Sequence, residues 1–99
     1  MAKRDARREL AELDSVFACL AHASRRHVLL VLHLHGGAMT AGEIASRFDC
    51  TWPTTSRHLK QLEEAGLVVV ETRGRERVYE VNGGLLKRVV GNWLERFAR

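Results

Sequence analysis

Hydrophobic positions repeat with a helical period in the first two thirds of the chain. Over residues 6–20, apolar side chains recur every three or four positions between charged residues, which predicts an amphipathic helix. A second helix is predicted from an N-cap at Ser24 to about Leu34. Its stretch 28–32 is apolar on almost every side, so we expect this helix at the centre of the core.

Two shorter helices with recognisable caps follow. Thr40 and Glu43 have the spacing of a capping box, which predicts a short helix ending near Asp49. Thr51 can cap the next helix, with Pro53 in its first turn, where a missing N–H costs nothing. The spacing therefore predicts two helices joined by a short turn.

The pattern changes to strict alternation after Gly66, a typical left-handed helix stop. Residues 67–72 and 77–81 read as two strands joined by a tight loop that contains Gly74. A last helix with a wide apolar stripe is expected over about 84–98.

This order of elements predicts a winged helix-turn-helix, mainly α with a β-hairpin wing (α-α-α-α-β-β-α). We expect one domain over residues 1–99, with the helix-turn-helix at about 40–65 and the wing at about 67–81. The helix at about 84–98 would serve dimerisation, because a chain of 99 residues buries only a modest core.

A helical wheel divides the fourth helix into two faces. Thr55, Leu59 and Leu62 cluster on one side and should be buried, while Arg57 is at the centre of the opposite side. Arginine can donate two hydrogen bonds to guanine, and small polar side chains can contact base edges or phosphates. In the wing, three arginines at alternate positions are expected to project to the same side. The predicted DNA-binding residues are Trp52, Pro53, Thr54, Ser56, Arg57, Lys60, Gln61, Arg73, Arg75 and Arg77.

The sequence motifs resemble those of ArsR/SmtB-type bacterial repressors. Residues 17–26 are similar to the family's opening F-x-A-L-x-x-P-T-R, with Ala23 where proline is common. Residues 54–68 resemble its recognition helix and strand start, S-x-S-x-V-S-x-H-L-K-x-L-x-x-A-G-L-V, and residues 74–79 resemble its wing. Trp52 and Pro53 replace small polar residues that are common in the family.

The resemblance implies a homodimer that binds an inverted-repeat operator in double-stranded DNA and blocks transcription. The interface would use the first and last helices, and the apolar residues assigned to it are Leu10, Leu13, Phe17, Leu86, Val90, Trp93 and Phe97. Many relatives release DNA when they bind metal. The segment 42–48 has no cysteine and residues 85–99 have no His, Asp or Cys, so we expect neither of the family's usual metal sites, and no cofactor. The inducer stays unidentified.

The remaining histidines and cysteines give weaker signals. His33 and His35 are two residues apart, which does not suit a shared metal on one helix face, whereas His58 matches the family's own structural histidine. Cys19 should be packed inside the first helix. Cys50 precedes a helix N-terminus, where the dipole can stabilise a thiolate, so a redox switch there is an alternative to a plain half-buried thiol.

Overall composition narrows the function classes. The net charge of +4 suits a polyanionic partner, and no apolar run is long enough to cross a bilayer. Residues 1–5 lack the apolar stretch of a signal peptide, so a cytoplasmic protein is expected. No nucleophile–base pair, phosphate loop or metal cluster suggests an enzyme. A winged-helix module that contacts protein or RNA is the alternative to a DNA-binding repressor, and salt dependence would help to separate them.

Overall fold

The computed structural model describes residues 3–48 and 51–98, and its elements follow the order of a winged helix-turn-helix. The body consists of α1 (Lys3–Leu20), α2 (Ala23–His35), β1 (Met39–Thr40), α3 (Ala41–Ala45), α4 (Trp52–Glu64), β2 (Val68–Arg73) and β3 (Glu76–Val81). A C-terminal helix follows as three consecutive pieces, α5 (Gly83–Leu86), η1 (Lys87–Gly91) and α6 (Asn92–Glu95). The predicted fold class is confirmed.

The core lies where α2 meets α1, α3, α4 and β3. Its buried side chains are Val16, Cys19, Val28, Leu29, Leu32, Met39, Ile44, Leu59, Leu62, Leu67, Val68, Tyr79 and Val89. Helix α2 lies at the centre of this core, as expected, although its nearly all-round apolar pattern does not mean burial on every side. Its Val28, Leu29 and Leu32 are buried, but Leu30 and Leu34 are 55% and 81% exposed, because no element of the described structure covers the outer face.

The sheet has three antiparallel strands in the order β1-β3-β2, one more than the sequence pattern predicts. Strand β1 is only two residues long, too short to show an alternating pattern. It pairs Met39 with Tyr79 and closes the free edge of β3 near the core. The hairpin turn consists of Gly74 and Arg75, and Gly74 has φ 63°, as the first central residue of a type II′ turn requires.

The turn between α1 and α2 differs from the prediction, because α2 begins at Ala23 and His22, not Ser24, stands at the N-cap. His22 makes no side-chain cap bond; its backbone carbonyl accepts from the amides of Arg25 and Arg26 at 3.2 Å each. The two arginines in turn serve the end of α1. Arg26 donates to the carbonyl of Leu20 at 2.7 Å, which satisfies a carbonyl that the helix end leaves free.

Helix α4 has the predicted stops at both ends. The Thr51 hydroxyl accepts from the Thr54 amide, and proline occupies the first turn. At the other end the Leu67 amide donates to the Leu62 carbonyl at 2.9 Å, and the Gly66 amide donates to the Glu63 carbonyl at 3.0 Å. These two bonds form a Schellman motif, and Gly66 has the left-handed φ of 79° that the motif needs.

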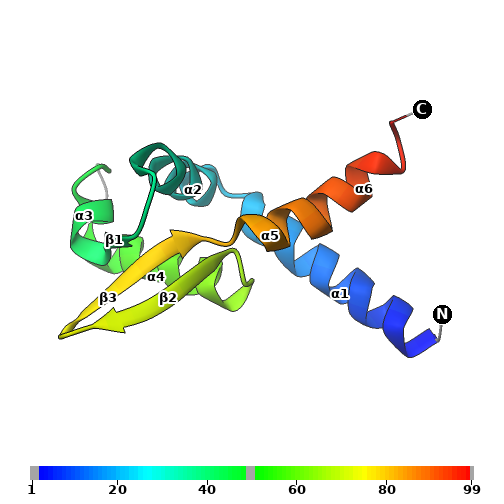
Figure 1. Ribbon diagram of the computed structural model, residues 1–99, viewed down its shortest axis with the longest axis horizontal. Coiled ribbons are helices and arrows are strands. Elements are labelled where there is room, and N and C mark those ends of the chain that lie inside the picture. The colour runs from blue at the N-terminus through cyan, green and yellow to red at the C-terminus, as the bar shows by residue number, and fades with distance from the viewer. Residues whose placement is uncertain (1–2, 49–50, 99) are drawn as a thin grey trace.

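The C-terminal helix is shorter than predicted and is not a regular α-helix. It ends at Glu95, and its central turn η1 is π-helical. Helix α1 and this C-terminal helix leave the body as two diverging arms (Figure 1). The radius of gyration is 14.7 Å, whereas a compact domain of this size has about 13 Å. The arms are therefore extended beyond the single-chain core.

Candidate nucleic-acid interface

The helix-turn-helix is formed by α3 and α4, and its first helix is tightly capped. The Thr40 hydroxyl accepts from the Glu43 amide, and the Glu43 carboxylate accepts from the Thr40 amide, both at 3.1 Å. The bond from the backbone of Thr40 is the main reason why the pKa of Glu43 is lowered from its usual 4.5. Ile44, fully buried, anchors this short helix against the core.

Helix α4 has one buried face and one exposed face, divided as the wheel predicts. Thr55, Leu59 and Leu62 are buried at 3%, 2% and 0% exposure. Thr54 is half-buried, and the other predicted DNA-contacting residues of the helix are exposed: Trp52, Pro53, Ser56, Arg57, Lys60 and Gln61. Among the described residues, no ion pair engages Arg57 or Lys60. The exposed face is therefore open to an anionic partner.

His58 holds α4 against the start of α2, which agrees with its predicted structural role. Its Nδ1 accepts a hydrogen bond from Arg25 Nε at 3.4 Å, and its ring centroid is 6.3 Å from that of His22. Burial lowers the pKa of His58 below 6.5, and the charges of Arg25, His22 and Arg57 lower it further. A neutral His58 is the form that can accept this bond.

The wing does not place its three arginines on one side, which corrects the sequence-based expectation. Thr72 lies opposite Arg77 and Arg73 opposite Glu76, and directly paired residues share a face of the sheet. Because Thr72 and Arg73 are adjacent in β2, Arg73 and Arg77 must point to opposite faces. The expectation counted alternation straight through the loop, but the two-residue turn resets the register.

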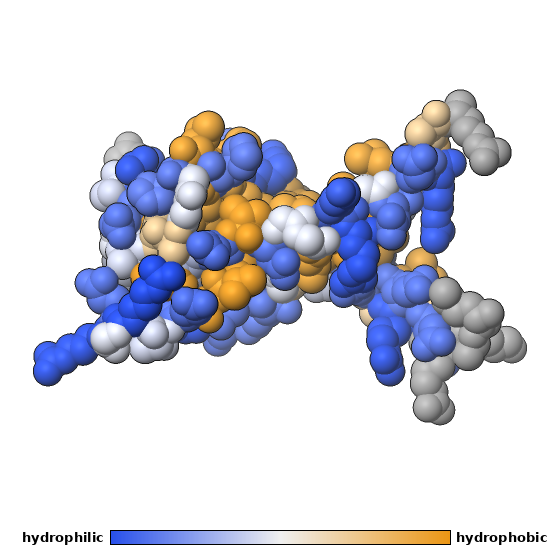
Figure 2. Space-filling model, viewed as in Figure 1, coloured by the Kyte–Doolittle hydropathy of each residue, from blue (hydrophilic) through white to orange (hydrophobic). Residues whose placement is uncertain are grey.

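Two of the wing arginines are already paired within the chain. Arg77 donates to Glu63 of α4 at 2.9 Å, with its guanidinium carbon 5.9 Å from the centre of the Tyr79 ring. Arg73 pairs with Glu71 at 3.4 Å. Arg75 lies in the turn at the tip, and no ion pair among the described residues involves it. In Figure 2 the tip is a thin hydrophilic projection away from the body.

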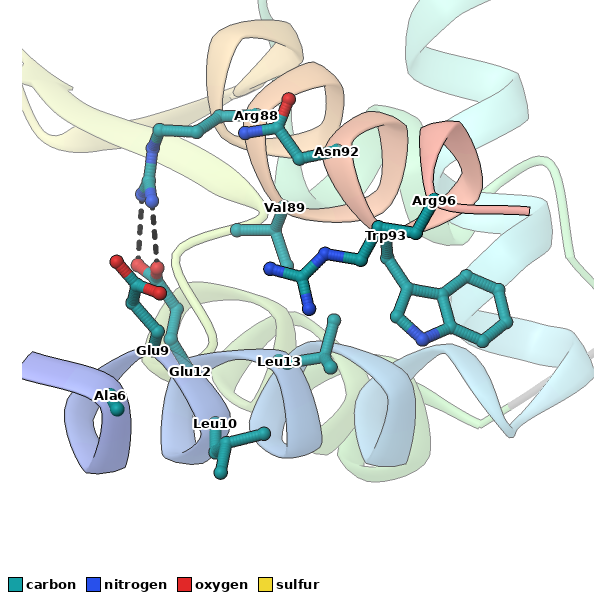
Figure 3. Close-up of a pocket in the computed structure, with 10 residues that line it drawn as sticks. All are labelled: Ala6, Glu9, Leu10, Glu12, Leu13, Arg88, Val89, Asn92, Trp93 and Arg96. Atoms are coloured by element: carbon teal, nitrogen blue, oxygen red, sulfur yellow. Dashed lines mark hydrogen bonds and ion pairs between the residues drawn. The ribbon is translucent and has the colours of Figure 1, made fainter. Parts of the chain in front are cut away.

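The two arms enclose a cleft of about 570 Å³ between α1 and the C-terminal helix. Figure 3 shows Leu13 and Val89 between the helices, with Arg96 extending its guanidinium into the same space. At the edge, Arg88 makes two hydrogen bonds to the Glu12 carboxylate, at 2.8 and 2.9 Å. These bonds lower the pKa of Glu12 and raise that of Arg88. The pair was missed from the sequence because its members are 76 residues apart.

The residues predicted at a dimer interface fall into two groups. Leu13, Leu86 and Val90 already pack partly against the core of their own chain. Phe17 is half-buried and makes an edge contact with Trp93 at 4.9 Å between ring centroids, and Trp93 makes a second with Phe97 at 5.2 Å.

The outer ends of both arms stay hydrophobic and uncovered. Leu10 is 59% exposed, Leu94 55% and Phe97 69%, and Trp93 is at 36%. Figure 2 shows such hydrophobic patches among the charged residues of both arms. The single chain leaves this surface without a covering element in the described structure.

Comparison with known proteins gives the family. Residues 20–71 match the model of a helix-turn-helix domain family. The chain is 33% identical to the transcriptional repressor SdpR of Bacillus subtilis over 85 residues, which cover 86% of this chain and 91% of SdpR. The crystal structure of an ArsR family transcriptional regulator superposes with a TM-score of 0.77 at 30% identity, covering 87% of this chain and 86% of that one. The chain belongs to the ArsR family of transcriptional regulators.

A second solved structure supports the ArsR-type fold. A domain from Mycobacterium bovis, described as a homodimeric winged helix-turn-helix DNA-binding domain, has a TM-score of 0.76 at 22% identity. It covers 97% of this chain and 87% of its own. At this identity the likeness concerns the fold, and it extends over both arms as well as the body.

Metal and redox chemistry gain no further support from the described part of this ArsR-family chain. Within residues 3–48 and 51–98, no group of three His, Cys, Asp or Glu side chains gathers as metal ligands would. Cys19 is buried as predicted, and burial raises the pKa of its thiol. Cys50, the predicted redox candidate, and Asp49 lie outside the described residues. Of the helices described, none is long and apolar enough to cross a membrane.

Proposed function

We propose that this ArsR-family chain is a homodimeric transcriptional repressor that binds an inverted-repeat operator in double-stranded DNA through α4. The observation that carries the proposal is the division of α4 into two faces. The side with Thr55, Leu59 and Leu62 is buried, so the side with Arg57 must face outward in one fixed orientation. A helix held in this way can enter the major groove, which admits one α-helix.

The charges of α4 favour insertion of its N-terminal end. No acidic residue occurs in its first turn, so the positive end of the helix dipole is uncompensated. Arg57 lies just beyond this turn, where it can donate two hydrogen bonds to a guanine edge. Lys60 follows one turn later and would contact phosphate.

The wing would add one phosphate or minor-groove contact. Its tip projects away from the body, and Arg75 is the cation at that tip. Arg73 and Arg77 make internal pairs and contribute less. We therefore expect Arg75 to be the principal wing residue that contacts DNA on each protomer.

Dimerisation would place two α4 helices on one operator. The exposed Leu10, Trp93, Leu94 and Phe97 give the arms an apolar surface that a second copy can cover. A two-fold dimer reads two half-sites about one turn of DNA apart, roughly 34 Å, which accounts for an inverted repeat. In this arrangement residues 1–99 form one domain, with recognition at 40–65, the wing at 67–81 and the dimer contact at 84–98 together with α1. DNA as the partner would place the protein in the cytoplasm.

A comparison of two variants tests this proposal. DNA fragments that bind the wild-type protein would first be selected from random duplexes. These fragments would then be titrated with wild type, Arg57→Ala and Lys60→Ala at several salt concentrations. At one base pair of the site, Arg57→Ala should reduce the binding free-energy difference between the preferred base and the other bases by about 1–3 kcal/mol. Lys60→Ala should weaken all duplexes alike and reduce the salt slope by about two, about one for each protomer of the dimer. Selection that yields no preferred sequence would overturn the proposal.

A further inference from the structure

Trp52 is a large apolar side chain at the tip of the recognition helix. It is the first residue of α4 and 54% exposed. Trp93, the other tryptophan, makes ring contacts with Phe17 and Phe97, whereas no ring contact among the described residues involves Trp52. Pro53, also exposed, follows it directly, so the tip of α4 presents an apolar surface to solvent.

The hydroxyls around this tip are used within the helix. Thr51 donates to the hydroxyl of Thr54 at 2.9 Å and accepts from its amide at 3.4 Å. Thr55 donates its hydroxyl to the Thr51 carbonyl at 3.2 Å. The threonines of the first turn therefore cap the helix start, and the indole is the largest exposed side chain at this end of α4.

We propose that Trp52, with Pro53 beside it, recognises the 5-methyl group of a thymine in the major groove. Among the base edges of unmodified DNA, this methyl is the one apolar group in that groove. An exposed indole at the leading end of the helix can exclude water from it without needing a donor or an acceptor. The inference deepens the proposed function, since it requires that α4 enters the groove.

Uracil substitution isolates this contact, because it deletes the methyl and leaves the hydrogen-bonding edge of thymine unchanged. The selected duplex would be made synthetically, so that thymine is its one source of 5-methyl groups. Each thymine would then be replaced in turn by uracil. At one position in each half-site, wild type should lose about fourfold in affinity, the ratio expected for burying one methyl group. Trp52→Gln should bind the thymine and uracil duplexes equally.

Trp52→Phe provides the matched control, because it keeps an aromatic ring at the same position. This variant should retain most of the discrimination against uracil. Thermal melting of each variant would show that the fold is intact, as expected for a half-exposed position. Discrimination that is the same in wild type and Trp52→Gln would overturn the inference, and so would a selected site at which no thymine is sensitive to uracil. Either result would leave the DNA-binding function standing, whereas selection without any preferred sequence would remove both.

Discussion

Arg25 donates a hydrogen bond from Nε to Nδ1 of His58 at 3.4 Å, and this contact joins the start of α2 to the middle of α4. Arg25 also donates to the Cys19 carbonyl at 3.5 Å, so one guanidinium of α2 contacts both α1 and α4. The orientation of α4 relative to the arm α1 is therefore coupled to a histidine that accepts this bond only in its neutral form. His22 and Arg57 add positive charge around that histidine.

This contact predicts a loss of stability in mild acid. The pKa of His58 is lowered in the folded chain, so the unfolded chain binds the proton first as the pH falls. The contribution of neutral His58 is complete above about pH 6.5, the pKa in the unfolded chain, and is lost as the pH falls through the folded value. When the pH is lowered from about 7.5 to about 5.5, the midpoint of thermal unfolding should therefore decrease less in His58→Gln than in wild type.

His33→Gln serves as the control for this pH series. His33 is exposed, and its substitution removes one histidine that has no part in the Arg25–His58 contact. It should follow wild type. If His58→Gln and His33→Gln showed the same pH dependence, the Arg25–His58 contact would have no role in stability.

The capping box of α3 predicts a measurable loss when its hydroxyl is removed. Thr40→Ala deletes the acceptor of the Glu43 amide and should cost about 1 kcal/mol of unfolding free energy. For a domain of this size that lowers the midpoint of thermal unfolding by about 4–8 °C. Thr40→Ser keeps the hydroxyl and should stay close to wild type. Equal losses in the two variants would show that the methyl group of Thr40, and not the cap, is responsible.

The exposed apolar ends of the arms predict where dimerisation can be broken. Phe97→Asp and Leu10→Asp each place a charge on surface that the proposed dimer buries. Full burial of such a side chain contributes about 1.5–3 kcal/mol, so the dissociation constant of the dimer should rise at least about tenfold. Sedimentation or light scattering would measure it.

Leu34→Asp is the matched control for the arms, since Leu34 is 81% exposed and belongs to α2, not to either arm. Its dissociation constant should equal that of wild type. A wild-type chain that is monomeric at micromolar concentration, or an effect of Leu34→Asp as large as that of Phe97→Asp, would place the interface elsewhere.

The helices and their stops could be predicted from the sequence because their signals are local. Thr51 with Pro53, and the glycine at 66, each act within one helical turn of their own position. The buried face of α4 followed from its period for the same reason. The cap of α2 was misplaced because His22 uses only its backbone, and a backbone acceptor leaves no trace in residue type.

The contacts that were missed depend on the tertiary structure. The pairs Arg88–Glu12 and Arg77–Glu63 join residues far apart in the chain, so no spacing rule reveals them. The π-helical turn η1 likewise has no residue signature within its stretch Lys87–Gly91. The Arg77–Glu63 pair engages one cation of the wing, and for this reason the sequence overstated the basic character of the wing.

The wing supplies the prediction in which sequence and structure differ most. From the sequence, Arg73, Arg75 and Arg77 should project to one side of the hairpin and bind DNA, whereas the structure pairs the first and the last with Glu71 and Glu63. Arg75→Ala should reduce the dependence of log affinity on log salt by about 1.8, because the proposed dimer loses one phosphate contact, equivalent to about 0.9, from each protomer. Arg73→Ala should leave that slope close to wild type, because a guanidinium that stays bound to Glu71 makes no phosphate contact. Arg77→Ala should cost less than about 1 kcal/mol of stability, since its pair with Glu63 is half-exposed. Titrations of the selected duplex at several salt concentrations would rank the three variants, and equal slopes for all three would show that the internal pairs open when DNA binds.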